Sequence, residues 1–257
     1  MKAGQKLWTR DELILAINLY CKLPFGRLHA KNPEVVTLAS LIGRTPGSIA
    51  YKLVNFASLD PSLQARGIKG ASNASKLDRE IWNEFYQDWD RLPFESEKLR
   101  ASIEHSTVEK LNQIDEDELP KEGRTRERIV KTRVNQAFFR TMILASYNNT
   151  CCITGLQNSE LLVAGHIKPW SIDEKNRLNP RNGLAMNALH DKAFESGLLT
   201  ITPDYKVKIS TLLKQQKKGL AVRDYFLQYD GKEILLPSRF LPDVEFLWHH
   251  NRERFKN

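Results

Sequence analysis

The sequence predicts an α+β protein, in which a helical N-terminal module precedes a module of mixed strands and helices. Helix caps followed by apolar residues at helical spacing recur through the first 110 or so residues. Short apolar runs typical of strands alternate with helical segments after about residue 150. Charge follows the same division, because residues 1–75 carry 10 basic and 4 acidic side chains, 76–120 carry 6 and 13, and 121–257 carry 23 and 14. We therefore expect a helical module at 1–92, a helical acidic connector and linker at 93–125, and a second module at 126–257.

Composition excludes several classes of protein. The 257 residues, with 41% hydrophobic and 27% charged side chains, are typical of a globular protein of one or two domains. No apolar run reaches the roughly 18 residues of a membrane span, and residues 1–6 lack the apolar stretch of a secretory signal. Three cysteines form no disulfide framework, and two CxxC pairs are absent, so we expect a cytoplasmic protein without structural zinc. A net charge of +8 favours a polyanionic partner.

Three helices are predicted in the first 60 residues. Thr9 and Glu12 form a capping box, and the apolar run that follows predicts a helix to about residue 21. Asn32 caps a second helix that ends at Gly43, and Thr45 caps a third. The second and third helices have the proportions of a helix-turn-helix, although a plain helical hairpin with a polar face would share them.

The third helix is the candidate DNA reader of this pair. Its expected outward side chains can exchange hydrogen bonds with base edges or phosphates. Arg44, at the positive end of that helix, suits a phosphate. The DNA-binding residues predicted in this module are Arg44, Ser48, Tyr51, Lys52 and Asn55.

The acidic region contains two further predicted helices. Residues 67–76 predict a mobile loop, either a basic arm that touches DNA or a simple connection. Residues 77–89 form an acidic amphipathic helix whose aromatic side chains we expect in the core, since the neighbouring carboxylates would repel phosphate. A helix is expected at about 95–111, and residues 112–125 resemble a linker.

The second module begins with a basic helix at about 126–147. Strand patterns surround 151–154 and 161–164, and a helix is expected at 188–195. Further strands are predicted at 198–201, 206–209 and 233–236, with a last helix near 244–255.

Three polar residues of this module are suited to phosphodiester hydrolysis. His166 stands at a strand end, Asn182 follows 16 residues later, and His190 lies eight residues beyond on a helix. Hydrolysis needs a base near neutral pH, which histidine provides, and a cation to stabilise the phosphorane and the departing oxygen. A carbonyl acceptor is also needed to fix the tautomer of the base.

The amino-acid sequence around these residues resembles the HNH nuclease motif, the ββα-metal finger. Its branch written CxITG, HIxPW, RxxPxNGLxL and LHDxAFxxGL is matched at residues 151–155, 166–170, 177–186 and 189–198, with Met186 in place of the last Leu of the third pattern. The resemblance covers about residues 126–210. The whole chain is similar to bacterial HNH restriction endonucleases, with a weaker match in the first module.

This resemblance implies roles for individual residues. His166 matches the general base, Asn182 the middle asparagine that orients the base region, and His190 a metal ligand. The commoner pattern has Asp or His before the base, where this chain has Gly165. Asn182 with His190 is therefore the first expected ligand set, and Asp191 or Glu195 the reserve. The implied cofactor is a divalent metal, Mg²⁺ before Mn²⁺.

Other polar residues near the motif have simpler alternatives. Trp170 is expected to be a packing anchor rather than a base-stacking wedge, and His249 and His250 are expected at the surface. The candidate phosphate clamps, each of which could be an ordinary surface cation, are Arg140, Lys168, Arg177 and Arg181.

The sequence thus predicts a metal-dependent endonuclease acting on double-stranded DNA, with 5′-phosphate and 3′-hydroxyl products and no membrane association. A restriction role is implied by the resemblance. A homodimer is expected if one finger cuts one strand, because cutting both strands of a duplex would then need two fingers. The alternatives are a DNA-binding protein with a finger that no longer cuts, for which Gly165 is the argument, and an endonuclease directed by base modification.

Overall fold

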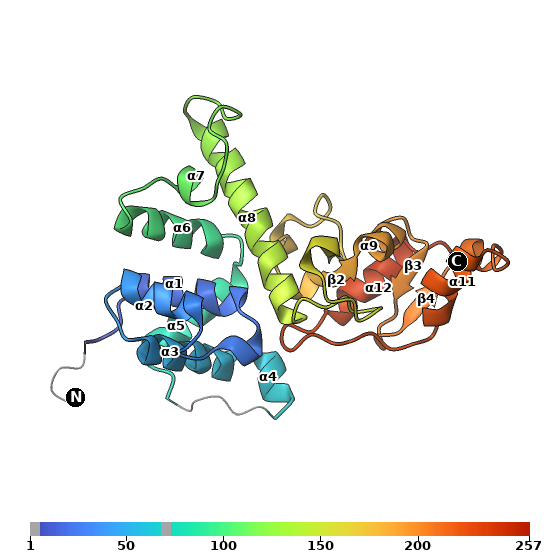
Figure 1. Cartoon of the computed structure of the whole chain (residues 1–257), viewed down its shortest axis with the longest axis horizontal. Coiled ribbons are helices and arrows are strands. Elements are labelled where there is room, and N and C mark those ends of the chain that lie inside the picture. Colours follow the sequence, from blue (N-terminus) through green and yellow to red (C-terminus); the bar gives the residue numbers. More distant parts are fainter. Residues whose placement is uncertain (1–5, 68–72) are drawn as a thin grey trace. The chain divides into compact units, whose positions relative to one another are not determined.

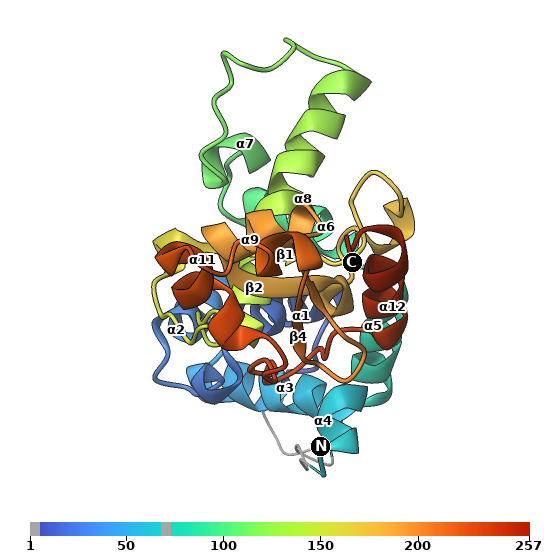
Figure 2. The same ribbon diagram turned by 90° about the vertical axis from the view of Figure 1, so that its right-hand side faces the viewer.

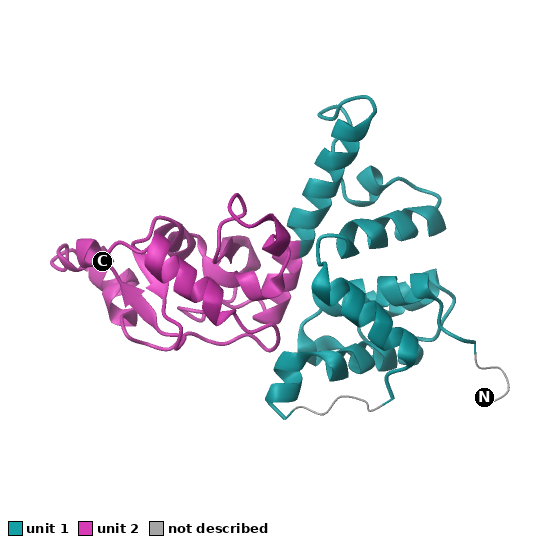
Figure 3. Ribbon diagram, turned by 180° about the vertical axis from the view of Figure 1, so that it is seen from behind, with its two compact units in different colours: residues 1–138 teal, residues 139–257 magenta. Residues whose placement is uncertain are grey.

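The computed structural model describes residues 6–67 and 73–257, which form two compact units at 1–138 and 139–257 (Figure 3). The division falls inside one long helix, α8 (Arg124–Ser146), whose two ends belong to different units. The boundaries at 92/93 and 125/126 stay predictions. In the described ranges, none of the helices has both the length and the apolar character that crossing a bilayer requires.

The first unit is helical and contains the predicted caps. Thr9 and Glu12 form the capping box of α1, Asn32 caps α2 and Thr45 caps α3. Gly43 has φ of +64°, as a residue that ends a helix in the left-handed region often does. The elements of this unit, apart from α8, are α1 (Arg10–Lys22), η1 (Phe25–Arg27), α2 (Pro33–Leu41), α3 (Pro46–Leu59), α4 (Pro61–Ala65), α5 (Lys76–Gln87), α6 (Leu92–Ile103) and α7 (Val108–Leu111).

Helix α1 is the centre of this unit. It is buried from Glu12 to Cys21 and contacts α2, α3, α5 and α6 (Figure 1). The rings of Tyr20, Phe56 and Trp82 pack together at centroid distances of 5.8–6.3 Å. The prediction that the aromatic side chains of 77–89 lie in the core is confirmed for Trp82, Phe85 and Trp89.

Two predictions for the connector need correction. The single helix expected at 95–111 is broken, because His105 takes a positive φ of 49° and Thr107 caps the separate helix α7. The segment 112–125 is not a loose linker throughout, since Ile114 and Leu119 are buried with Val130 of α8. Half of the predicted loop at 67–76, namely residues 68–72, lies outside the described residues.

The second unit holds two antiparallel hairpins and the helices packed on them. Strand β1 (Leu162–His166) pairs with β2 (Gly183–Asn187), and helix α9 (Ala188–Glu195) lies against both strands (Figures 1 and 2). Strand β3 (Leu199–Ile201) pairs with β4 (Val207–Ile209). The remaining elements are η2 (Ser159–Leu161), η3 (Glu174–Asn176), η4 (Pro180–Asn182), α10 (Thr211–Lys214), α11 (Leu220–Tyr225), η5 (Leu227–Tyr229) and α12 (Val244–Glu253).

Strand predictions in this unit were partly wrong. Residues 151–154 form a turn ending at Gly155, with φ of +76°, although Cys152 donates its backbone N–H to Ala185 of β2. The strand expected at 233–236 is reduced to one bridge between Glu233 and Lys206. Strand β2 was not predicted, because its run of small and apolar residues does not alternate. Both its faces are covered, as residues 183–186 are all buried.

Candidate active site

His166 is the last residue of β1 and lies in an aromatic cage. Its ring stacks on Phe139 of α8 at a centroid distance of 4.0 Å and meets Trp170 edge-on at 5.5 Å. Opposite it on β2 is Gly183, where a Cβ atom would come within 3.0 Å of Phe139 Cζ and closer still to Ile143. The missing side chain of Gly183 therefore lets α8 approach the hairpin and hold the His166 ring.

The protonation of His166 is fixed by its hydrogen bond. Nε2 lies 2.8 Å from the backbone carbonyl oxygen of Arg177, which can only accept, so Nε2 carries the proton. Burial lowers the pKa of His166 below its usual value, against the opposing effect of that hydrogen bond. The neutral ring therefore dominates near pH 7 and leaves a lone pair on Nδ1, for which the described residues provide no hydrogen-bond partner. This is the protonation state that a general base needs.

Asn182 holds the loop that supplies this carbonyl. Its side chain is buried; Oδ1 accepts from the backbone N–H of Lys168 at 2.7 Å, and Nδ2 donates to the carbonyls of Lys168 and Asn176 at 3.1 Å each. Asn176 directly precedes Arg177, so Asn182 positions the segment on which the tautomer of His166 depends. All polar atoms of Asn182 are thus engaged in the loop, which argues against its predicted role as a metal ligand.

A cavity of about 440 Å³ joins His166 to the next helix. It is lined by β1, the loop after it, α9 and the C-terminal helix, and its polar side chains include His166, Asp191 and Glu195. A Cβ atom on Gly165 would stand 2.2 Å from Asp191 Oδ1. The carboxylate of Asp191 therefore occupies the space that a side chain at position 165 would need. The glycine therefore leaves the room in which this carboxylate lines the cavity.

Asp191 carries a half-buried carboxylate that lines this cavity. Among the described residues it makes no hydrogen bond and no ion pair. Burial raises its pKa to about 6; the charge of Glu195, one helical turn further on, raises it too, and the charge of Lys192 lowers it. A divalent cation would relieve both effects, and carboxylate oxygens are the donors that Mg²⁺ and Mn²⁺ prefer. The described residues contain no group of three or more His, Cys, Asp or Glu side chains suited to a metal. Phosphate and water would have to complete the coordination of a cation bound here.

His190 does not line this cavity. Its Nδ1 lies 3.0 Å from Asn187 Nδ2, and its Nε2 lies 2.6 Å from the carbonyl oxygen of Tyr225. The ring is buried against Phe226 and Tyr229. Both ring nitrogens of His190 thus have partners within the fold, which argues against its predicted role as a metal ligand. The His190 side chain instead anchors α9.

The candidate phosphate clamps of this unit all have partners within the fold. Arg140 donates to the carbonyls of Leu162 and Ser159, and Lys168 pairs with Asp173 at 2.8 Å. Arg177 donates to the Trp170 carbonyl and pairs with Glu174, and Arg181 pairs with Asp243 at 3.0 Å. Trp170 is half-buried between His166 and the guanidinium of Arg177, as expected of a packing anchor.

One cavity residue was missed from the sequence. His250 was expected at the surface, but it is 2% exposed and stacks on Phe194 at 3.7 Å. Burial lowers its pKa to about 4. Its Nε2 lies 3.0 Å from the Phe194 carbonyl, and its Nδ1 bonds the Thr200 hydroxyl. In the sequence, the apolar Leu247 stands three residues before His250, and this helical spacing was a signal that both side chains face inward.

The predicted DNA-reading helix α3 differs from expectation at two positions. Lys52 and Asn55 were expected to point outward, but they are 6% and 1% exposed. Lys52 Nζ contacts both carboxylate oxygens of Asp78, at 2.8 and 2.9 Å. Leu53 and Phe56 are buried as predicted, so the inward face of α3 is wider than the sequence suggested and takes in the positions on either side.

Arg44 is also committed to the fold. Its guanidinium pairs with Glu12 at 2.7 Å, donates to the carbonyls of Lys6 and Leu7, and lies 4.1 Å from the Trp8 ring centroid. Ser48 is half-buried. Tyr51 is 47% exposed, and its hydroxyl accepts from Asn73. Only these last two candidates remain on the surface of α3, and the reading-helix assignment stays a prediction.

Comparison with known proteins adds one finding. A family model described as HNH endonuclease matches residues 151–202, which contain β1, β2, α9 and most of the residues that line the cavity. No curated protein matches the chain. The second unit therefore contains a domain of the HNH endonuclease family.

Proposed function

We propose that this protein is a metal-dependent DNA endonuclease whose cutting site is the cavity of His166 and Asp191. The observation that carries the proposal is their placement: a neutral histidine and a half-buried carboxylate line the same cavity, and among the described residues neither Nδ1 of the histidine nor the carboxylate has a partner. The HNH family match supports nuclease activity in general. DNA as substrate, the cleavage chemistry and a restriction role are the finer parts of the proposal.

In the proposed reaction His166 removes a proton from water, and the oxygen attacks phosphorus in line with the 3′ oxygen. The P–O3′ bond breaks and the departing O3′ takes a proton from solvent water, so the products carry a 5′-phosphate and a 3′-hydroxyl. The backbone carbonyl of Arg177 accepts a hydrogen bond from Nε2 of His166, which leaves Nδ1 to take the proton. Asn182 holds in place the loop that contains Arg177. Phe139 excludes water from one face of the ring.

Asp191, with Glu195 as its neighbour, would hold the divalent cation, for which we propose Mg²⁺. When bound there, the cation supplies positive charge that stabilises the phosphorane and the departing oxygen. This assignment places the cation on Asp191 and Glu195, the reserve ligands, instead of on Asn182 and His190. It also answers the main argument for an inactive finger, because Gly165 makes room for a carboxylate rather than marking the loss of one.

The test is cleavage of plasmid and genomic DNA, plain and cytosine-modified, with Mg²⁺ or Mn²⁺. Wild type is compared with His166→Ala, and with His249→Ala as a matched control outside the cavity. We expect metal-dependent fragments or nicks with wild type and the control, and none with His166→Ala. Equal cleavage by wild type and His166→Ala would reject the assignment of the base. Salt-sensitive binding without cutting on every substrate would instead support a DNA-binding protein.

A further inference from the structure

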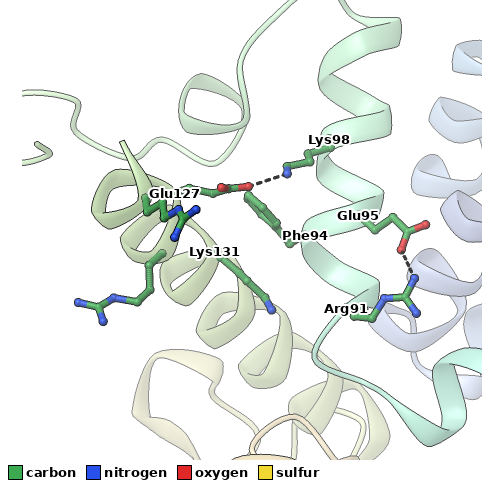
Figure 4. A pocket seen from close by; sticks show the side chains of 8 residues that line it. Arg91, Phe94, Glu95, Lys98, Glu127 and Lys131 are labelled. Carbon is green, nitrogen blue, oxygen red and sulfur yellow. Dashed lines mark hydrogen bonds and ion pairs between the residues drawn. The ribbon is translucent and has the colours of Figure 1, made fainter. Parts of the chain in front are cut away.

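Two helices of the first unit face each other across a basic groove of about 460 Å³ (Figure 4). Residues spaced i, i+3, i+4 and i+7 line it on both sides, so each helix presents one continuous face. The lining residues are Arg91, Phe94, Glu95 and Lys98 on or just before α6, and Arg124, Glu127, Arg128 and Lys131 on α8. Five of the eight are cationic and two are acidic.

Most of the charges in the groove are neutralised locally. Lys98 pairs with Glu127 at 2.8 Å, and Arg91 pairs with Glu95 at 3.2 Å. Lys131 pairs with Asp90, outside the groove. Figure 4 shows Lys98 reaching from α6 to Glu127 on α8, which ties the two walls together. Three of the five cations thus already have carboxylate partners, and both acidic residues of the groove are among those partners.

Arg124 and Arg128 are the exception. Both side chains are exposed, and neither makes an ion pair or side-chain hydrogen bond with any residue the structure describes. They stand one helical turn apart on the same face of α8, a spacing at which like charges destabilise a helix. Two guanidinium groups without a carboxylate, on one wall of a groove, leave an uncompensated positive charge that an anion would offset.

The aromatic side chain of Phe94 gives the groove an apolar component. The Phe94 ring is half-buried, rests on the apolar cluster of Ile114, Leu119, Val130 and Val134, and lies under Lys98 Nζ at 4.4 Å. An apolar surface beside unpaired arginines suits a ligand with a charged group and a less polar part next to it.

We propose that this groove binds the sugar–phosphate backbone of a nucleic acid, with Arg124 and Arg128 on phosphate oxygens and Phe94 against a sugar or base. Guanidinium groups bind phosphate bidentately, and an aromatic ring is a stacking surface for nucleotides. The partner class is the one proposed for the second unit, but the groove does not depend on cleavage. It gives the first unit a DNA contact that differs from the reading helix expected at α3.

The experiment measures binding of the full chain to a fluorescent DNA duplex in EDTA, over a series of salt concentrations. The variant Arg124→Gln/Arg128→Gln is compared with Arg27→Gln/Arg79→Gln, which removes two exposed arginines of the same unit that also make no ion pair within the described part of the chain. We expect the groove variant to bind roughly tenfold or more weakly. The slope of log K against log salt should fall by about 1.8, the value for two lost phosphate contacts. The control should change little in either quantity.

Three outcomes would overturn the proposal. Equal weakening of both double variants would show only a loss of general charge. No weakening of the groove variant would remove the groove from the interface. Retained DNA binding, together with loss of the thermal stabilisation that inorganic phosphate gives wild type, would assign the groove to a small phosphate ligand. Since no cleavage is measured, failure here is distinct from failure of the endonuclease assignment.

Discussion

Two charged pairs of the first unit contrast with one carboxylate of the second. In the first unit Lys52 pairs with Asp78, and Arg44 pairs with Glu12. In the second unit the half-buried Asp191 shares its cavity with His166 and makes neither an ion pair nor a hydrogen bond with any residue the structure describes. A buried pair satisfies itself and needs no ligand, whereas a desolvated carboxylate without a partner remains costly until a proton or a cation joins it. The two ion pairs therefore hold the fold, whereas Asp191 is available for chemistry.

The sharpest test of this contrast is Asp191→Asn. The amide keeps the size of the side chain but removes the charge proposed to hold the cation. We expect cleavage to fall about a thousandfold, equivalent to ~4 kcal/mol of transition-state stabilisation. The melting temperature should stay the same or rise, because a desolvated carboxylate is lost. Asp224→Asn, on an exposed residue of the same unit, is the control; unchanged cleavage by Asp191→Asn would place the cation elsewhere.

In the first unit the same kind of change should affect folding and not DNA binding. Lys52→Met leaves Asp78, which is 0% exposed, without its partner. We expect urea unfolding to show a loss of about 3 kcal/mol. The control Lys76→Met removes a lysine that is 92% exposed, and should cost under about 0.5 kcal/mol. If Lys52→Met kept full stability but bound DNA more weakly, the original reading-helix expectation would be right for this residue.

The close approach of Gly165 to Asp191 gives a third test. In Gly165→Ala the new methyl group would meet Asp191 Oδ1, the end of a side chain that can swing away. The fold should survive while the carboxylate leaves the cavity, so we expect cleavage to fall about a hundredfold, ~3 kcal/mol, with little change in melting temperature. Combining it with Asp191→Asn should add nothing further. Gly219→Ala, where a Cβ meets no atom closer than 3.5 Å, is the control.

Sequence patterns predicted much of this structure because caps and periodicity are local. The capping box at Thr9 and the caps at Asn32 and Thr45 stand where they were expected. What failed depended on pairing across the chain. Neither the ion pair of Lys52 with a residue 26 positions away nor the carbonyl partner of His190 at 35 positions can be read from helical spacing. Gly165 was interpreted as a missing ligand because the neighbour that fills its space lies on another element.

The smallest expected effect concerns Glu12 and its dependence on pH. Burial alone would raise the pKa of Glu12, but hydrogen bonds from Arg44, the Thr9 backbone and Lys6 outweigh it and lower the pKa to about 2. A carboxylate whose pKa is depressed on folding stabilises the protein above its unfolded value of 4.5, and that contribution is lost as the pH falls from there towards 2.

We therefore expect Glu12→Gln to cost about 2 kcal/mol near neutral pH, and clearly less at about pH 3. Urea unfolding of wild type and variant at both pH values measures the difference, with Glu34→Gln as the control, since that exposed carboxylate has no ion pair within the described residues. A cost that did not shrink on acidification would mean that Glu12 acts through packing. The paired charges of the first unit would then be those of Lys52 with Asp78 and of Lys22 with Glu97.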